Sequence, residues 1–184
     1  NTCGALTQWY RDVLFPDFLR EEQEGGESAF SRMPQGLEQI PPGCGGLITL
    51  PYFAGERSPI NDPNARGVIF GLNLSHTRQH LYRSALEGIG FSLRQHLDVI
   101  RSHQLPVRKL MAVGGGTKNP QWMQIVSDIL GQPLQVAAVS VGAAYGDALM
   151  AALGTGRCTD FSQLQSVLSV ERVYQPDQER HRAY

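Results

Sequence analysis

The feature that most constrains the fold is a short strand that runs through three glycines into a helix. The apolar run and the glycines together occupy Leu110–Gly116. Asn119 is a favourable N-cap, and Pro120 suits the first helical position, where no amide donor is needed. Apolar residues then recur on one helical face, at Trp122, Ile125, Val126, Ile129 and Leu130. Gly131 follows them and predicts the end of the helix.

Glycines at this point remove side chains where another molecule must approach the backbone closely, and a nucleotide is the leading candidate. A tight turn that needs positive φ and binds nothing accounts for them equally well, because short glycine motifs are common. A dinucleotide-binding fold is disfavoured. Its fingerprint needs a third glycine where Asn119 stands, and an acidic residue at the end of the next strand. The next apolar run, Leu134–Val139, is followed by no acid before Asp147.

Strands and helices alternate after residue 105, which predicts an α/β fold with right-handed crossovers and a partly parallel sheet. The longest helix is expected over Thr77–His103. A helix of small residues over Gly142–Leu153 is expected either to pack tightly against another helix or to be a buried, alanine-rich helix. About two parallel strands are visible, and Thr2–Arg11 already resembles a helix interior. The fold is therefore expected to be incomplete at its N-terminus and the chain to be part of something longer.

The rest of the chain is divided by turn-forming residues. The expected elements are a helix over Gly4–Phe15, a polar loop over Glu21–Glu27, a helix over Ala29–Ile40, and strands over Leu47–Phe53 and Val68–Leu72. Pro51 restricts the first of these strands to the edge or the end of a sheet. We assign residues 1–156 to one domain and residues 157–184 to a polar C-terminal tail, whose last residues, Asp177–Tyr184, are expected to fray.

Composition excludes several classes of protein. The 184 residues suit a single domain, with 41% hydrophobic residues, 18% charged residues and a net charge of -1. This balance gives no reason to expect nucleic acid as a partner, and no apolar run is long enough to span a membrane. With no signal peptide apparent, the cytoplasm is the default location. Cys3, Cys44 and Cys158 are widely spaced and are expected to be reduced packing residues.

The most specific motif begins at Gly67-Val68-Ile69-Phe70-Gly71-Leu72 and, after seven further residues, continues through His80–Glu87. It resembles the second signature of the FGGY carbohydrate kinases, and every constrained position agrees over 21 residues. Further matches stand in the family's order on both sides, at Leu50–Arg57, Asp62–Gly67, Gly114–Gly116, Trp122–Gln124, Asp128 and Gly142–Gly146. The resemblance covers about residues 1–156, close to the whole chain.

The resemblance implies the actin-like ATPase architecture, in which two ribonuclease-H-like domains hold ATP and a sugar in the cleft between them. In that family, ATP with Mg²⁺ phosphorylates a sugar hydroxyl and an aspartate acts as the base. This chain resembles the larger part of the second domain. Gly115, Gly116 and Asn119 fall on the family's adenine and ribose turn, and Gly4 and Gln8 fall on the helix that flanks the nucleotide from the other side.

The sugar follows from weaker matches. Gly55-Glu56-Arg57 and Ser75–Arg78 resemble the members that act on D-xylulose, although kinases of gluconate and of other pentuloses share much of this pattern. The family's catalytic aspartate, its first phosphate loop and most of its sugar contacts belong to the first domain, which precedes this sequence. We therefore assign no catalytic residue and no metal ligand to this chain.

The remaining polar candidates have a structural explanation beside each functional one. Asp62 is the one tempting acid in the polar loop, but it is expected to be the Asx residue of an Asp-Pro turn. Glu56 and Arg57 could pair across a cleft or bind substrate, and a surface ion pair that holds the loop is favoured. Arg66 could reach a phosphate or only a carbonyl. His76 and His80 stand at i, i+4, but they lack a third ligand nearby, so a hydrogen-bonding role for His80 at the helix start is favoured over zinc.

Two functions stay open at this point. The first is the adenosine-binding side of an ATP-dependent sugar kinase for D-xylulose, inactive alone and compatible with a homodimer. The second is a non-catalytic module of actin-like ancestry that binds a nucleotide or a partner. An upstream sequence with a glycine-rich phosphate loop and an aspartate would favour the first function, and a natural start codon near Asn1 would favour the second.

Overall fold

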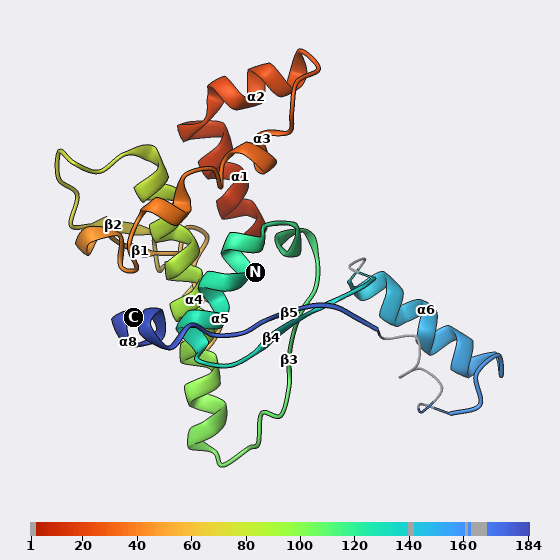
Figure 1. Cartoon of the computed structure of the whole chain (residues 1–184). Coiled ribbons are helices and arrows are strands. Elements are labelled where there is room, and N and C mark those ends of the chain that lie inside the picture. Colours follow the sequence, from red (N-terminus) through yellow and green to blue (C-terminus); the bar gives the residue numbers. More distant parts are fainter. Residues whose placement is uncertain (1–2, 140–141, 161, 163–168) are drawn as a thin grey trace.

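The structure is a computed structural model, and it describes residues 3–139, 142–160, 162 and 169–184 (Figure 1). Its helices, 3-10 turns (η) and strands follow each other along the chain. They are α1 (Cys3–Leu14), α2 (Pro16–Gln23), α3 (Ala29–Arg32), η1 (Leu37–Gln39), η2 (Cys44–Gly46), β1 (Ile48–Leu50), β2 (Val68–Phe70), α4 (Arg78–Ser102), β3 (Leu110–Ala112), η3 (Gly115–Lys118), α5 (Pro120–Leu130), β4 (Leu134–Ala137), α6 (Ala143–Gly154), β5 (Val170–Tyr174) and α8 (Gln178–Ala183).

A three-stranded sheet in the order β3–β4–β5 carries the α/β part of the fold. β3 and β4 are parallel, with Leu110 opposite Leu134, and α5 makes the crossover between them. β5 pairs with β4 in the antiparallel sense, with Tyr174 opposite Leu134. The partly parallel α/β sheet is therefore confirmed. β5 was not predicted, because it lies within the segment that polarity marked as a tail.

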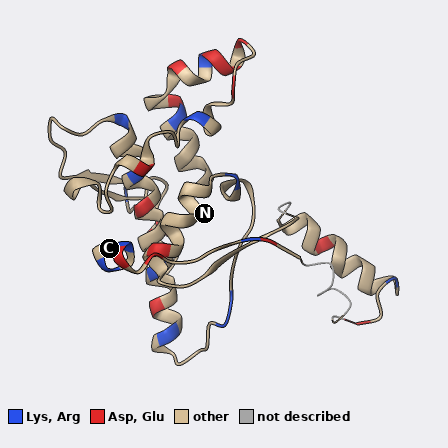
Figure 2. Cartoon of the chain, in the orientation of Figure 1, with Lys and Arg blue, Asp and Glu red and all other residues tan. Residues whose placement is uncertain are grey.

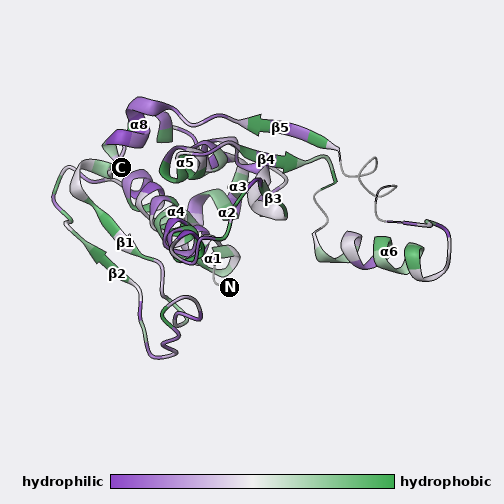
Figure 3. Ribbon diagram, turned by 90° about the horizontal axis from the view of Figure 1, so that it is seen from below, coloured by the Kyte–Doolittle hydropathy of each residue, from purple (hydrophilic) through white to green (hydrophobic). Residues whose placement is uncertain are grey.

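β1 and β2 form a separate antiparallel hairpin, in which Ile48 faces Phe70 and Thr49 faces Ile69. Thr49 points into the core and is buried, whereas the outward side chains of Ile48 and Phe70 are 52% and 70% exposed. Figure 3 shows both strands in the colours of hydrophobic residues. Both strands are shorter than expected, and β1 ends at Leu50, immediately before Pro51, as a proline at a strand end requires.

The core centres on α4, which packs against both α5 and β1. All nine residues over Tyr82–Gly90 are buried, so this part of the helix is enclosed by protein on every side. Two glycines permit the close contacts. A Cβ at Gly88 would lie 2.2 Å from the carbonyl oxygen of Thr49, and one at Gly90 would lie 2.6 Å from Ile129 Cδ1. The expected helix over residues 77–103 is confirmed, with Thr77 as its N-cap.

The N-terminal region partly differs from expectation. α1 matches the expected first helix and buries Leu6 and Tyr10. α2 extends into the predicted polar loop and ends only at Gln23. The expected helix over residues 29–40 is wrong, because it divides into α3 and the turn η1. α3 ends at Arg32, just before Pro34, which has no N–H to continue the helical hydrogen bonds, and Gly36, with a φ of 86°, then separates η1 from it.

The C-terminal residues are ordered, and the expected fraying of Asp177–Tyr184 is wrong. Asp177 caps α8, since its side chain accepts hydrogen bonds from the backbone N–H groups of Glu179 and Arg180, at 2.9 and 3.0 Å. Tyr184 donates its hydroxyl to the buried Glu87 at 2.8 Å. Polar side chains here satisfy buried groups of other helices, which a polar sequence cannot reveal by itself. The division of the chain at residue 156 stays a prediction.

α6 differs from both expectations for the helix of small residues. None of its residues is buried in the described part of the chain, and Figure 1 shows it standing apart from the sheet. Of the cysteines, Cys44 is buried as expected, but Cys3 is exposed and is not a packing residue. Figure 2 shows acidic and basic residues interspersed on α2, α4 and α8. Among the described helices, none combines the length and the apolar character needed to cross a bilayer.

Candidate nucleotide-binding site

The candidate site is the glycine turn between β3 and α5, which is closed by short-range hydrogen bonds. The carbonyl oxygen of Gly114 accepts from the backbone N–H of Thr117 at 3.2 Å and from its hydroxyl at 2.7 Å. The backbone N–H of Asn119 donates to the carbonyl of Gly116 at 3.1 Å. These bonds form the single turn η3, which holds the chain in position before α5 begins at Pro120.

The three glycines of this turn are glycines for different physical reasons. Gly114 has a φ of 90° and a ψ of −175°, a conformation that side chains disfavour. Gly116 has no positive φ, but a Cβ there would lie 2.7 Å from Cζ3 of the Trp122 ring. Gly115 has neither constraint, because a Cβ there would meet no described atom within 4 Å. Gly115 therefore leaves the surface of the turn open without any need imposed by the fold.

Asn119 is the N-cap of α5, as predicted. Its Oδ1 accepts from the backbone N–H of Trp122 at 3.0 Å, which satisfies a donor of the first helical turn. Its Nδ2 faces the hydroxyl of Tyr82 at 3.5 Å, at the long limit of a hydrogen bond. The N-cap role uses only the side-chain oxygen, so it does not explain what the amide nitrogen does.

Tyr82 joins the two halves of the candidate site. It belongs to the His80–Glu87 part of the signature, but no role of its own was predicted for it. It lies on α4 and is buried, and burial raises the pKa of its hydroxyl to about 12, so the phenol stays protonated at neutral pH. Its ring centroid is 6.2 Å from that of Tyr10 on α1, while its hydroxyl faces Asn119. α1 and the glycine turn therefore contact the same side chain.

The other predicted residues, Gly4 and Gln8, lie one helical turn apart on α1 and are both exposed. The buried face of the helix is formed instead by Leu6 and Tyr10. A Cβ at Gly4 would meet no described atom within 4 Å, so this position also leaves open surface. The assignment of these two residues to the nucleotide stays a prediction.

The polar residues of the long loop after β1 form hydrogen bonds within the loop. Asp62 Oδ1 accepts from the backbone N–H of Asn64 at 2.8 Å, the expected Asx turn. Arg66 donates to the carbonyl oxygens of Pro63 and Ala65, at 3.1 and 2.9 Å, so it reaches a carbonyl as expected, and a contact with a phosphate stays a prediction. The expected ion pair of Glu56 with Arg57 is wrong. Glu56 instead accepts from the backbone N–H of Ser58 at 2.7 Å, and this bond holds the loop.

The two histidines before and within α4 serve as hydrogen-bond acceptors. His80 Nδ1 accepts from the backbone N–H of Thr77 at 3.2 Å, which completes a capping box at the start of α4. His76 Nδ1 accepts from the backbone N–H of Asn73 at 3.1 Å. The predicted helix-start role of His80 is confirmed.

The model of the FGGY family of carbohydrate kinases, C-terminal domain, matches residues 1–155. A xylulose kinase of Bacillus subtilis (strain 168) is 38% identical over 154 residues, which cover 84% of this chain and 29% of that protein. A gluconokinase of Bacillus licheniformis is 27% identical over 185 residues, which cover 100% of this chain and 36% of the relative.

Among solved structures, a xylulose kinase from Rhodospirillum rubrum matches with a TM-score of 0.80 and 34% sequence identity. The match covers 98% of this chain and 35% of that one. The fold is thus that of a domain from the actin-like ATPase class of sugar kinases. The chain belongs to the FGGY family of carbohydrate kinases. It spans about a third of the length of these relatives.

Proposed function

We propose that the protein containing this chain is an ATP-dependent sugar kinase, which transfers the terminal phosphoryl group of ATP to a hydroxyl of D-xylulose. Membership of the FGGY family supports the reaction class. The choice of D-xylulose is supported by similarity to the xylulose kinases of Bacillus subtilis and Rhodospirillum rubrum. A gluconokinase is also similar over the whole chain, so the sugar needs a direct test.

Within that enzyme, this chain would supply the adenosine-binding side of the site. The carrying observation is Gly115, which leaves open surface in a turn whose other two glycines are required by the fold. We assign Gly115, Gly116 and Asn119 to the adenine and ribose, and Gly4 and Gln8 to the opposite side of the nucleotide. A base lying on the turn would contact backbone at Gly115, where any branched side chain would exclude it.

The remaining chemistry would come from outside this chain. The aspartate that accepts the proton of the sugar hydroxyl, and a loop that binds the phosphates, are expected in the other part of the protein. Mg²⁺ would be expected to neutralise the phosphate charge. In the described part of this chain, no three His, Cys, Asp or Glu side chains are arranged to hold a metal ion. That this chain supplies no Mg²⁺ ligand stays a prediction.

The test is a kinase assay on the intact natural polypeptide that contains this chain. ADP release is followed with D-xylulose, D-gluconate and glycerol as acceptors, and we expect the highest kcat/KM for D-xylulose. A higher value for another acceptor would overturn the substrate assignment. ATP binding without transfer to any sugar would favour the non-catalytic module instead.

A second sample, the 184-residue chain alone, tests the division of roles. We expect no phosphoryl transfer from it, because general-base and electrostatic contributions are each worth orders of magnitude in rate. Circular dichroism on the same sample establishes that it is folded. Turnover comparable with that of the intact polypeptide would refute the assignment of the base to the missing part.

A further inference from the structure

We propose that Asp128 is a positioning residue for the nucleotide site, because it fixes helix α5, and with it the glycine turn, to the C-terminal segment Tyr174–Tyr184. The proposal rests on the proposed function of the turn. It concerns how the turn is held in place, and it assigns Asp128 no contact with the nucleotide.

α5 transmits any displacement from one end to the other. Its N-cap, Asn119, belongs to the turn, and eight of its 11 residues are buried, from Trp122 onward, whereas Pro120 at its start is exposed. Asn119 and Asp128 are nine residues apart, or about 14 Å along the helix axis. A tilt of about 4° at Asp128 would move the turn by about 1 Å, enough to weaken binding substantially.

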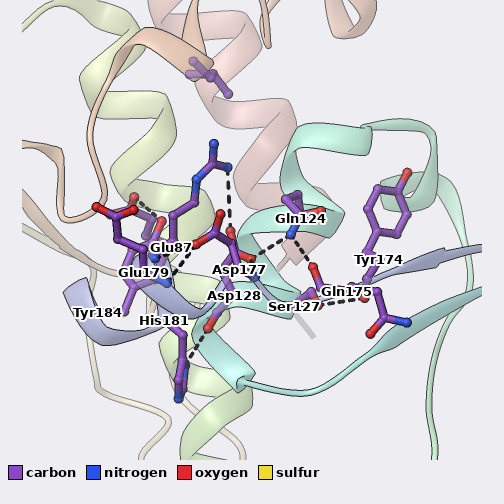
Figure 4. A network of polar contacts seen from close by, with 12 residues as sticks. Glu87, Gln124, Ser127, Asp128, Tyr174, Gln175, Asp177, Glu179, His181 and Tyr184 are labelled. Carbon is purple, nitrogen blue, oxygen red and sulfur yellow. Dashed lines mark hydrogen bonds and ion pairs between the residues drawn. The ribbon is translucent and has the colours of Figure 1, made fainter.

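Asp128 makes the principal polar attachment of α5, as Figure 4 shows. Its side chain is 1% exposed, and its Oδ1 accepts from the backbone N–H of Asp177 at 2.8 Å and from Gln124 Nε2 at 2.7 Å. Its backbone carbonyl is 2.7 Å from Nδ1 of His181 on α8. Arg180 lies on the same side, with its Nη1 3.8 Å from Oδ2. One residue of α5 thus contacts three residues of the C-terminal segment.

Two neighbours on α5 strengthen this attachment. Gln124 Nε2 also donates to the carbonyl of Gln175 at 2.8 Å, so it connects Asp128 to the chain that leaves β5. The hydroxyl of Ser127, which is fully buried, is 2.9 Å from the carbonyl oxygens of both Gln132 and Tyr174. Tyr174, Gln175 and Asp177 are therefore each hydrogen-bonded through their backbone to a side chain of α5.

The C-terminal segment can serve as an anchor because it is itself held to α4. The Tyr184 hydroxyl donates to Glu87 Oε1 at 2.8 Å, and Arg83 Nη2 donates to the same hydroxyl at 3.0 Å. Glu87 and Arg83 are both buried and form an ion pair at 2.8 Å. α5 also packs directly against α4, and Asp128 adds a second connection, through the C-terminal segment, to the buried part of α4.

An acid at position 128 is an unfavourable choice unless it is needed for this attachment. Burial raises the pKa of the carboxyl, and the Asp177 N–H, Gln124 and Arg180 partly offset that effect. Without an acceptor at this position, the part-buried N–H of Asp177 would lose its hydrogen-bond partner, and the C-terminal segment would be held less firmly to α5. The carboxylate is therefore best explained by the donors that it receives from the C-terminal segment.

The test compares three variants of the intact polypeptide with the wild type. Asp128→Ala removes the acceptor, whereas Asp128→Asn keeps an Oδ1 that can accept both hydrogen bonds. Asp98→Ala is the matched control, because Asp98 is an exposed acid on α4 that pairs only with Arg94 and Arg101 among the described residues. ATP binding is measured by calorimetry, the KM of ATP and of the sugar by kinetics, and folding by thermal melts.

For Asp128→Ala we expect the Kd and KM of ATP to rise by about tenfold, with the sugar KM changed by less than about twofold. Asp128→Asn should restore ATP binding, and Asp98→Ala should leave it unchanged. A purely structural role would lower the melting temperature of Asp128→Ala without changing the ATP Kd per folded molecule, and this result would overturn the proposal. An equal rise of both KM values would also overturn it.

Should Asp128→Ala fail to fold, Gln124→Leu replaces it, because Gln124 is only partly buried and its loss removes the bonds to Asp128 and Gln175. A raised ATP Kd in this folded variant supports the proposal, and an unchanged one refutes it. Failure of the wild type to bind ATP would instead refute the proposed function of the turn. The two failures are therefore distinguishable.

Discussion

The three glycines of the turn are expected to respond differently to substitution, because each is a glycine for a different reason. Gly114→Ala places a side chain on a residue whose φ is 90°, which costs about 1–3 kcal/mol of stability. Gly116→Ala places a Cβ 2.7 Å from the Trp122 ring, and overpacking of this kind costs about 1–3 kcal/mol. Gly115→Val meets neither obstacle, so its free energy of unfolding should change little.

The effect on ATP affinity should have the opposite order, with Gly115→Val the most harmful variant. A branched side chain at position 115 would occupy the surface on which the adenine or ribose is proposed to lie, so we expect the ATP Kd to rise by at least about tenfold. For a domain of this size, each 1 kcal/mol lost lowers the melting temperature by about 2–4 °C. The Gly114 and Gly116 variants should therefore melt several degrees lower, while the Gly115 variant melts close to the wild type.

Thermal melts and ATP titrations on the same samples of intact polypeptide measure both quantities. The titrations are run well below the lowest melting temperature, so that each value refers to folded protein. If Gly115→Val lowers the melting temperature and leaves the ATP affinity of the folded molecule unchanged, the turn has only a structural role. Equal losses of affinity in all three variants would also refute the argument, because they would leave Gly115 with no special position.

Three further predictions follow from single contacts. Asn119→Ala should lower the free energy of unfolding by about 1 kcal/mol, because the N-cap is lost, and should weaken ATP binding by about 0.5–1.5 kcal/mol. Asn119→Ser should restore the melting temperature but not ATP binding. If serine restores both equally, Asn119 is only a helix cap. Burial and the neighbouring His76 lower the pKa of His80, so its neutral form stabilises the fold above about pH 6.5 and that stability is lost as the pH falls. His80→Gln keeps an acceptor for Thr77 and does not titrate, so it should melt above the wild type at about pH 5.5 and close to it at about pH 7.5; parallel melting curves would contradict this. Arg83→Met should lower the free energy of unfolding, measured in urea, by about 3–5 kcal/mol, because it leaves the carboxylate of Glu87 buried without its cation. The double variant Arg83→Met/Glu87→Gln should recover part of this loss.

The features that the sequence predicted correctly depend on residues close together in the chain. The N-cap at Asn119, the helix after it and the strand before it follow from capping and from the spacing of apolar residues. The helix-start role of His80 is set by the residue three positions before it. The signature over Gly67–Glu87 was sufficient to indicate the family that the comparisons then established.

The expectation of a frayed C-terminal end failed because of contacts between residues that are far apart in the chain. Polarity predicted a frayed end, yet Asp128 receives the N–H of a residue 49 positions away, and Arg83 meets Tyr184 across 101 positions. The same polar residue type can be buried or solvated, and only the tertiary contacts distinguish the two cases. The glycine turn shows the same division. The sequence determined that three glycines stand there, whereas the Trp122 ring and the backbone conformation decided that only Gly115 is free of the fold's own requirements.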